Sequence, residues 1–145
     1  MRLTRHSDYA LRVLLYLGIT SESLVTIGEI ADRYGISRNH LMKVVNRLAT
    51  HGYVETVRGK RGGIRLAKPP EAINLGELLR QTEEEFHMAE CFDTNRGPCR
   101  IAGSCSLRPV LGEALEAFFE ALGRYTLADL LRNSCSDIAV DLDLA

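Results

Sequence analysis

Residues 26–50 read TIGEIADRYGISRNHLMKVVNRLAT, two short helical patterns separated by a glycine. Thr26 and Glu29 form a capping box that opens the first helix, and Gly35 ends it. Ser37 is a good N-cap for the second helix, which continues to about Thr50. Two short helices joined by a tight turn, the second with a polar start, are typical of a helix-turn-helix that binds DNA.

The second helix of this pattern has an apolar side and a polar side. Its apolar stripe consists of Leu41, Val44, Val45 and Leu48. The residues left on the exposed side or in the entering turn are Arg38, Asn39, His40, Lys43 and Arg47. Because the polar side of such a helix enters the major groove, we expect these residues to contact base edges or phosphates.

A β-hairpin is predicted immediately after the two helices. Residues 53–57 alternate as a strand, residues 64–67 form a return strand, and the tip between them reads RGKRGG. The glycines allow the backbone to approach a surface closely. We therefore interpret the hairpin as the wing of a winged helix, with Arg58, Lys60 and Arg61 on phosphates or in the minor groove. The alternative is a basic loop that only keeps the hairpin soluble.

The net charge of −1 hides an uneven distribution along the chain. Residues 1–80 hold 13 Lys/Arg against 7 Asp/Glu, whereas residues 81–145 hold 5 against 12. Residues 33–68 contain nine basic side chains and one acidic side chain, Glu55. Such a basic segment is what a contact with DNA phosphates requires. The first half is therefore expected to bind double-stranded operator DNA.

Four further helices are predicted around this unit, giving a mainly α fold with a small β-hairpin wing. One runs from Thr4 to about Gly18, and a short one over residues 75–82 is capped by Asn74. A long amphipathic helix covers residues 110–122, and we expect it to pack against the first helix and against a second subunit. The predicted divisions are a DNA-binding domain (1–80), a cysteine loop (81–106), a dimerisation helix with a short terminal helix (107–133) and a frayed acidic tail (134–145).

No apolar run is long enough to cross a membrane, and no signal-peptide cleavage site follows the start of the chain. The sequence therefore predicts a cytoplasmic protein. In that reducing compartment, the four cysteines are better interpreted as metal or redox groups than as disulfides.

Three of the cysteines lie close together before the long helix. Cys91, Cys99 and Cys105 follow a Cys-x7-Cys-x5-Cys pattern in a loop-like segment. Thiolates at this density can hold zinc or an iron–sulfur cluster, and the spacing does not choose between them. A four-coordinate site would need one more ligand, which could be His87, Cys135 or a residue from elsewhere.

The order of these features resembles the winged-helix iron–sulfur repressors, the family that includes IscR and NsrR, over roughly residues 1–132. The strings that carry the resemblance are Leu3-Thr4 with Asp8-Tyr9, YGISRNH (34–40), GYV (52–54), VRGK (57–60), GGIRL (62–66) and YTLADL (125–130). The match is best to the NsrR branch. The family implies a homodimer that binds palindromic operator DNA, with no enzymatic activity.

The resemblance also implies a ligand set and a signal. In the IscR branch a histidine three residues after the last cysteine is a ligand, whereas this chain has Arg108 there. In the NsrR branch three cysteines hold a [4Fe–4S] cluster, and an aspartate from the partner subunit, matching Asp8, is the fourth ligand. That branch responds to nitric oxide by nitrosylation and release of DNA. A [2Fe–2S] cluster or zinc is the less favoured cofactor, and the gap from Cys91 to Cys99 is longer than usual in the family.

Asp8 is also the expected switch residue. A carboxylate is a weaker ligand for iron than a thiolate, so small molecules could attack at that position. Asp8 lies one helical turn before Arg12, and its release from iron would let it pair with Arg12 and shift the first helix. One alternative function is a zinc- or thiol-based redox regulator without a cluster. A second is a thiol enzyme, but the sequence contains no Cys-x-x-Cys motif and no convincing Cys/His pair.

Overall fold

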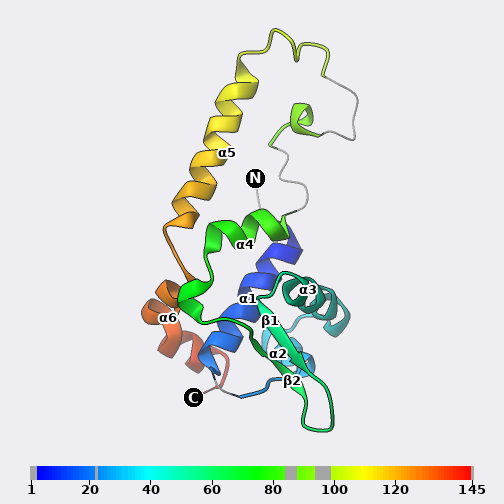
Figure 1. Cartoon of the computed structure of the whole chain (residues 1–145), viewed down its shortest axis with the longest axis vertical. Helices are drawn as coiled ribbons and strands as arrows, with labels where there is room; N and C mark the ends of the chain where they lie inside the picture. Colours follow the sequence, from blue (N-terminus) through cyan, green and yellow to red (C-terminus); the bar gives the residue numbers. More distant parts are fainter. Residues whose placement is uncertain (1–2, 22, 84–87, 94–98, 145) are drawn as a thin grey trace.

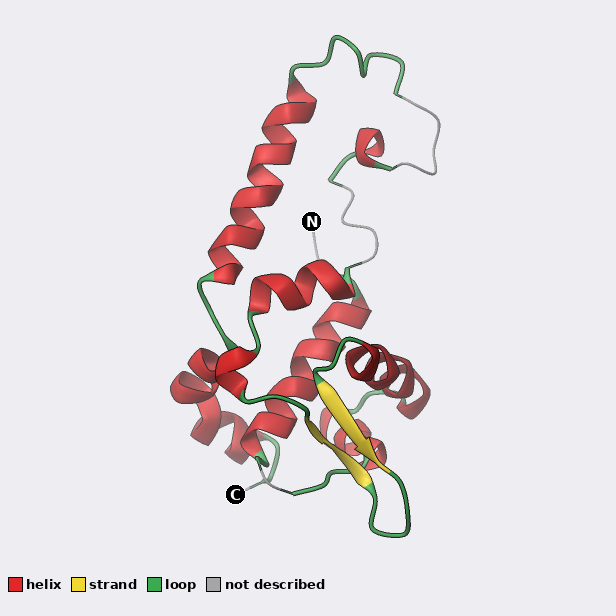
Figure 2. Ribbon diagram, viewed as in Figure 1, coloured by secondary structure: helices red, strands yellow, loops and turns green. Residues whose placement is uncertain are grey.

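The computed structural model describes residues 3–21, 23–83, 88–93 and 99–144, and this part is mainly helical with one small antiparallel sheet (Figures 1 and 2). The elements are α1 (Arg5–Ile19), α2 (Ile27–Tyr34), α3 (Arg38–Thr50), β1 (Val54–Val57), β2 (Gly63–Leu66), η1 (Pro70–Ala72), α4 (Leu75–Thr82), η2 (Glu90–Phe92), α5 (Leu107–Gly123) and α6 (Leu127–Asp141). The predicted fold class, a mainly α chain with a hairpin wing, is confirmed.

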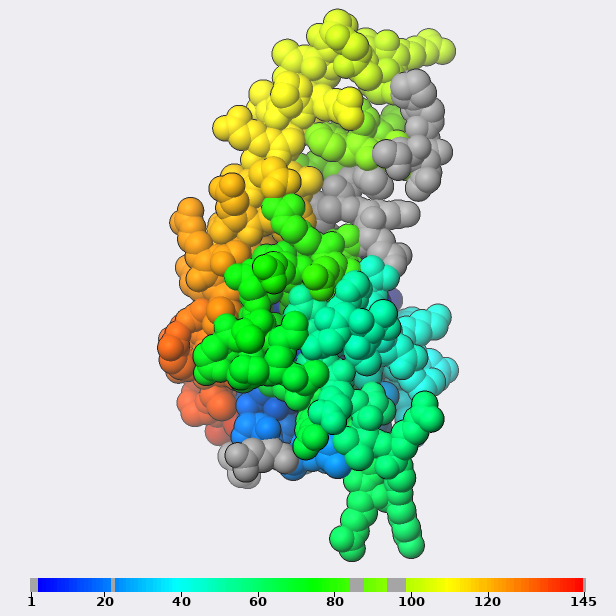
Figure 3. All heavy atoms as spheres, in the orientation of Figure 1, coloured from blue at the N-terminus to red at the C-terminus, as the bar shows by residue number. Residues whose placement is uncertain are grey.

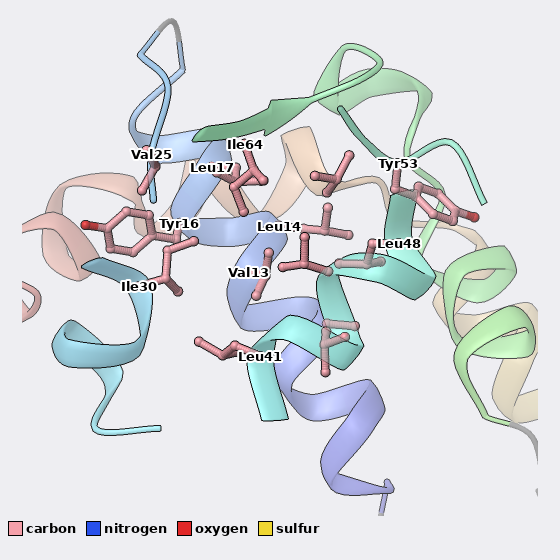
Figure 4. Close-up of a cluster of buried hydrophobic side chains, with 14 of the residues drawn as sticks. Val13, Leu14, Tyr16, Leu17, Val25, Ile30, Leu41, Leu48, Tyr53 and Ile64 are labelled. Atoms are coloured by element: carbon pink, nitrogen blue, oxygen red, sulfur yellow. The ribbon is translucent and has the colours of Figure 1, made fainter. Parts of the chain in front are cut away.

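α1 lies at the centre of the N-terminal half. It begins after Thr4, whose side chain accepts a hydrogen bond from the Ser7 amide, as expected of an N-cap. Its buried side is fully covered by α3, α6 and the sheet. Figure 4 shows Val13 and Leu14 of α1 beside Leu41 and Leu48 of α3, with Ile64 of β2 above them. This core fixes the helix-turn-helix against the wing.

The two predicted helices of the helix-turn-helix are confirmed, but their caps differ in detail. Thr26 accepts from the Glu29 amide, whereas the Glu29 carboxylate accepts from the hydroxyl of Tyr16 at 3.2 Å and is not described bonding back to Thr26. The Ser37 side chain makes no capping hydrogen bond to α3. Gly35 has a φ of +63°, the left-handed conformation that ends α2 and turns the chain into α3.

The wing is an antiparallel hairpin with Glu55 opposite Arg65. Its inner strand also pairs with Val25, whose amide and carbonyl both bond to Ile64. At the tip, the Gly62 amide donates to the Gly59 carbonyl at 3.0 Å, and a Cβ on Gly62 would lie 2.2 Å from the Val57 carbonyl oxygen. The turn at the tip is therefore tight, and Figure 3 shows the hairpin region projecting from the lower end of the body.

The packing of the long helix differs from the prediction. α5 packs on α4, and it is α6 that packs along α1 (Figure 1). The reason is two close approaches: a Cβ on Gly76 of α4 would lie 2.7 Å from the Phe119 carbonyl oxygen of α5, and Gly18 of α1 admits the side chain of Leu131 from α6. α5 therefore leaves the body, and the chain returns to α1 only through α6.

The prediction that residues from Ser134 onward are frayed is wrong. α6 continues to Asp141, Leu142 is buried, and Ile138 and Leu144 pack against the core. An ion pair of 3.6 Å between Asp143 and Arg33 of α2 also joins this end to the helix-turn-helix. Apolar burial outweighs the acidic composition of the segment. Within the described residues, no helix is long and apolar enough to cross a membrane.

Candidate DNA-binding surface and cysteine segment

α3 presents its polar side to solvent, as the sequence predicts. The stripe of Leu41, Val44, Val45 and Leu48 is buried, so the opposite side must face outward. The exposed residues are Arg38, Asn39, His40, Met42, Lys43 and Asn46. The ring of His40 lies 6.4 Å from that of Tyr9 on α1, a contact that positions the start of α3 against α1.

Arg47 differs from the other predicted DNA contacts. Its Nη2 and Nε atoms donate to the main-chain oxygen of Gln81, at 2.8 and 3.2 Å, near the end of α4. Its side chain is half-buried between the two helices. The geometry therefore gives Arg47 a role in fixing α3 to α4, which no pattern in the local sequence could have indicated.

The wing exposes all three predicted cations. Arg58, Lys60 and Arg61 lie around the turn at the tip, and all three are exposed. Further up the hairpin, Arg65 binds Glu55 through two hydrogen bonds of 3.1 and 3.2 Å, and these bonds and its charge hold the pKa of Glu55 below its usual range. The single acid of the basic segment is thereby neutralised, which leaves the tip strongly positive.

Asp8 and Arg12 form the predicted pair on α1. The Arg12 Nη2 and Nε atoms each lie 3.1 Å from an oxygen of Asp8, and both side chains are a little over two-fifths exposed. The Arg12 guanidinium also lies 5.8 Å from the ring centroid of Tyr34, the last residue of α2. Asp8 is therefore accessible from outside and connected, through Arg12, to the turn of the helix-turn-helix.

The end of α4 is joined to two other helices by a set of hydrogen bonds that we call the α4 clasp. On the α1 side, the Ser7 hydroxyl donates to the Thr82 hydroxyl at 2.9 Å, and the Thr4 amide donates to the Glu83 carboxylate at 2.8 Å. Ser7, Thr82 and Glu83 are all buried. On the α3 side, the clasp is completed by Arg47 and Gln81. The α4 clasp thus fixes the point from which the chain continues towards the cysteines.

The cysteines lie outside the core. Cys91 is in η2, and Cys99 and Cys105 are in the turns before α5; all are free thiols and half-buried. Arg108, at the start of α5, lies 6.0 Å from the ring centroid of Phe92 in η2. His87 lies outside the described residues, and among those described no three metal-binding side chains form a single group. Thiols are suitable ligands for a thiophilic metal, so the chemistry of these three cysteines fits such a centre, although the described residues do not bring them together into one.

α5 carries an apolar face that the described part of the chain leaves only partly covered. Only Phe119 of its 17 residues is buried, beneath Arg80 of α4 at 4.2 Å. Leu107 and Val110 are more than half exposed. The remaining apolar residues of this face, Leu111, Leu115, Phe118 and Leu122, are half-buried. A continuous apolar face of this kind is typical of an association surface.

Comparison with known proteins identifies the family. The model of a family described as "Rrf2: Iron-dependent Transcriptional regulator" matches residues 3–133. The chain belongs to the Rrf2 family. Rrf2 relatives include the HTH-type transcriptional regulators NsrR of Bacillus subtilis, 52% identical over 92% of both chains, and of Bacillus licheniformis, 50% identical over 92% of this chain and 94% of that protein.

Solved Rrf2-like structures confirm the fold. The structure titled "T. potens IscR" has a TM-score of 0.74 and 24% identity, and covers 92% of this chain and 88% of that chain. The cysteine regulator CymR of B. subtilis has a TM-score of 0.68 at 25% identity, over 92% of this chain and 98% of that chain. The predictions of a DNA-binding transcriptional regulator, and of a protein that is not an enzyme, are confirmed by these relationships.

Proposed function

We propose that the chain is a homodimeric, cytoplasmic transcriptional repressor that holds a [4Fe–4S] cluster and releases palindromic operator DNA in response to nitric oxide. The observation that carries this proposal is the α4 clasp. It joins the start of the cysteine-bearing part of the chain to α3, the candidate reading helix, and to α1, which carries Asp8. We therefore expect a structural change at the cysteines to be transmitted through the clasp to the DNA-binding surface.

The proposed contacts with DNA come from α3 and from the wing. Arg38, Asn39 and Lys43 read base edges or adjoining phosphates in the major groove, with His40 at the entering turn. The wing cations Arg58, Lys60 and Arg61 bind the backbone or the minor groove. We assign Arg47 a positioning role, because its guanidinium is engaged by Gln81.

The proposed cluster ligands are Cys91, Cys99 and Cys105, with Asp8 of the partner subunit as the fourth. When bound, the cluster supplies iron that can react with nitric oxide, most readily where a carboxylate is the ligand. In the chain described here Asp8 is paired with Arg12, and both are accessible. Asp8 thus has two alternative partners, the metal centre and Arg12, and its exchange between them would move Arg12 against Tyr34. The NsrR names of the relatives support this proposal.

The dimer is proposed to form through α5. Its uncovered apolar face would be buried by the same face of a second copy, as a two-fold symmetric interface requires. Two winged helices held in this way would match two half-sites of a palindrome.

The test is anaerobic purification of the full chain, followed by its visible spectrum, iron and sulfide analysis, and operator binding. We expect a coloured protein with four iron and four sulfide per chain, as the proposed [4Fe–4S] cluster requires. Nitric oxide should bleach the colour and weaken operator binding, and the cluster-free protein should bind weakly as well. Zinc in place of iron, or equal operator affinity in all three states, would refute the sensor function while leaving DNA binding intact.

A heterodimer tests where Asp8 acts. If the ligand comes from the partner, a purified dimer of one Asp8→Ala chain and one Cys99→Ala chain keeps one complete site and about half the cluster content. If Asp8 acts within its own chain, both sites are incomplete and no native-like cluster remains. Asp8→Ala homodimers are the control. An equally stable cluster in them would show that Asp8 is dispensable and would make His87 the next candidate for the fourth ligand.

A further inference from the structure

Met42 is an exposed large apolar side chain in the middle of the candidate reading helix. It is 46% exposed, whereas its neighbour Leu41 is fully buried. The α3 core stripe is formed by other residues, so Met42 is not needed to close the core. Burial against a partner would stabilise this side chain, because it otherwise leaves apolar surface in water.

Helical spacing places Met42 among polar residues on the outward side of α3. Asn39, Lys43 and Asn46 lie three residues before it, one after it and four after it, and all are exposed. These four residues form a continuous strip directed away from Leu41 and the rest of the core. A ligand of this strip must therefore offer polar groups with an apolar group among them.

The major groove of DNA offers that combination at an A·T pair. Thymine presents its C5-methyl group there, the one apolar group on the base edges, and its partner adenine presents the N6 and N7 atoms that a side-chain amide can bind. The strip holds two amides, Asn39 and Asn46, on either side of an apolar thioether. The basic surroundings, nine Lys/Arg against one acid over residues 33–68, favour DNA over a protein partner.

We propose that Met42 determines sequence specificity by packing against the C5-methyl group of a thymine in each half-site. This inference rests on the proposal that α3 enters the major groove. It predicts that specificity at one position depends on a methyl group rather than on hydrogen bonds. The Met42 side chain has the length and flexibility to follow that methyl into the groove.

The experiment combines the protein variant with a change of one DNA methyl. The probe is the duplex selected in vitro by the full chain from a randomised library, in which each thymine in turn is replaced by deoxyuridine. Because deoxyuridine lacks only the C5-methyl, we expect the wild type to lose about fourfold in affinity at one thymine per half-site, as burial of one methyl-sized group gives. Met42→Ala should bind the unmodified duplex more weakly and lose nothing further at that position.

Two control variants make the result specific. Asn46→Ala should retain the fourfold sensitivity to deoxyuridine, because its contact is a separate one, and Met42→Leu should retain part of it. Equal deoxyuridine losses for the wild type and Met42→Ala, or no loss at any thymine, would overturn the inference. Loss of self-association in Met42→Ala with an unchanged deoxyuridine profile would do so too, and would identify a protein contact instead. If Asn39→Ala and Lys43→Ala also leave binding unchanged, the result contradicts the proposal that α3 enters the major groove rather than the role of Met42 alone.

Discussion

The N-terminal body, residues 3–83, and the arm formed by α5 differ in how many of their residues a single chain buries. α1 buries six of its 15 residues, whereas α5 buries one of 17. The body shares one continuous core with α6, whereas the cysteines of the arm lie outside that core and form no metal-binding group among the described residues. The DNA-binding half thus buries its apolar side chains within one chain, and the arm leaves exposed the apolar face and the thiols that the proposed dimer and metal centre would use.

The largest effect should come from replacing the cysteines, which tests whether the arm holds a metal centre. Replacing Cys91, Cys99 or Cys105 singly by Ala should abolish or severely deplete the cluster, because each removes one of a minimal set of thiolates. Iron and sulfide analysis after anaerobic purification measures this. Cys135→Ala, in α6, is the matched control and should keep full iron content. Loss of iron in that variant alone would mean that the ligand set is wrong.

The second prediction concerns a charge introduced into the apolar face of α5. Val110→Glu places a charge where the proposed interface excludes water, which should convert the dimer to monomers and weaken operator binding at least about 100-fold, since a buried unpaired charge costs several kcal/mol. Sedimentation and operator titration measure the two effects. Glu120→Gln removes a charge from an exposed position that helical spacing places across α5 from the apolar face, and it should leave the dimer intact. A Val110→Glu protein that is still dimeric would place the interface elsewhere.

The third prediction concerns the connection between body and arm. Thr82→Val keeps the shape of the side chain but leaves the Ser7 hydroxyl without its buried partner, which should cost about 1–3 kcal/mol of stability. If the α4 clasp transmits the cluster state, the ratio of operator affinities with and without cluster should also fall several-fold. Thr82→Ser retains the hydroxyl and should restore the ratio. A variant that loses stability with an unchanged ratio would make the clasp structural only.

The smallest effect should come from the wing. Lys60→Ala removes one proposed phosphate contact, so operator binding should weaken for all sequences, and the slope of log affinity against log salt should become shallower by about 0.9. Titrations at several salt concentrations measure the slope. Glu71→Gln, which changes a charge away from the hairpin, serves as the reference. Equal slopes for the wild type and Lys60→Ala would contradict the wing assignment.

The sequence predicted the body well because its signals are local. Caps such as Thr26 and Asn74, and the apolar spacing of α3, act within a single turn of helix, so they can be recognised without a tertiary structure. The capping box of α6, Thr126 with Asp129, is equally local, but it marks only where the helix begins, and the acidic composition beyond it predicts a frayed end.

The contacts that could not be predicted are those between distant segments. Arg47 looks like another cation of the reading helix, and only the folded chain brings it to the carbonyl of Gln81, 34 residues away. The same holds for the choice of α6 rather than α5 as the partner of α1, which depends on the room that Gly18 leaves for Leu131. Backbone acceptors and close approaches of this kind leave no periodic signal in a sequence.

The packing of α6 on α1 has a consequence for how the protein is made. Leu127 and Leu142 belong to the same core as Leu14 of α1, although more than 110 residues separate them along the chain. During synthesis, α1 leaves the ribosome long before α6 exists, and the part of its apolar side that α6 covers stays exposed until residues 127–144 have emerged. The DNA-binding body is therefore the first part to be translated and among the last to be sealed, which ties its maturation to completion of the cysteine-bearing arm.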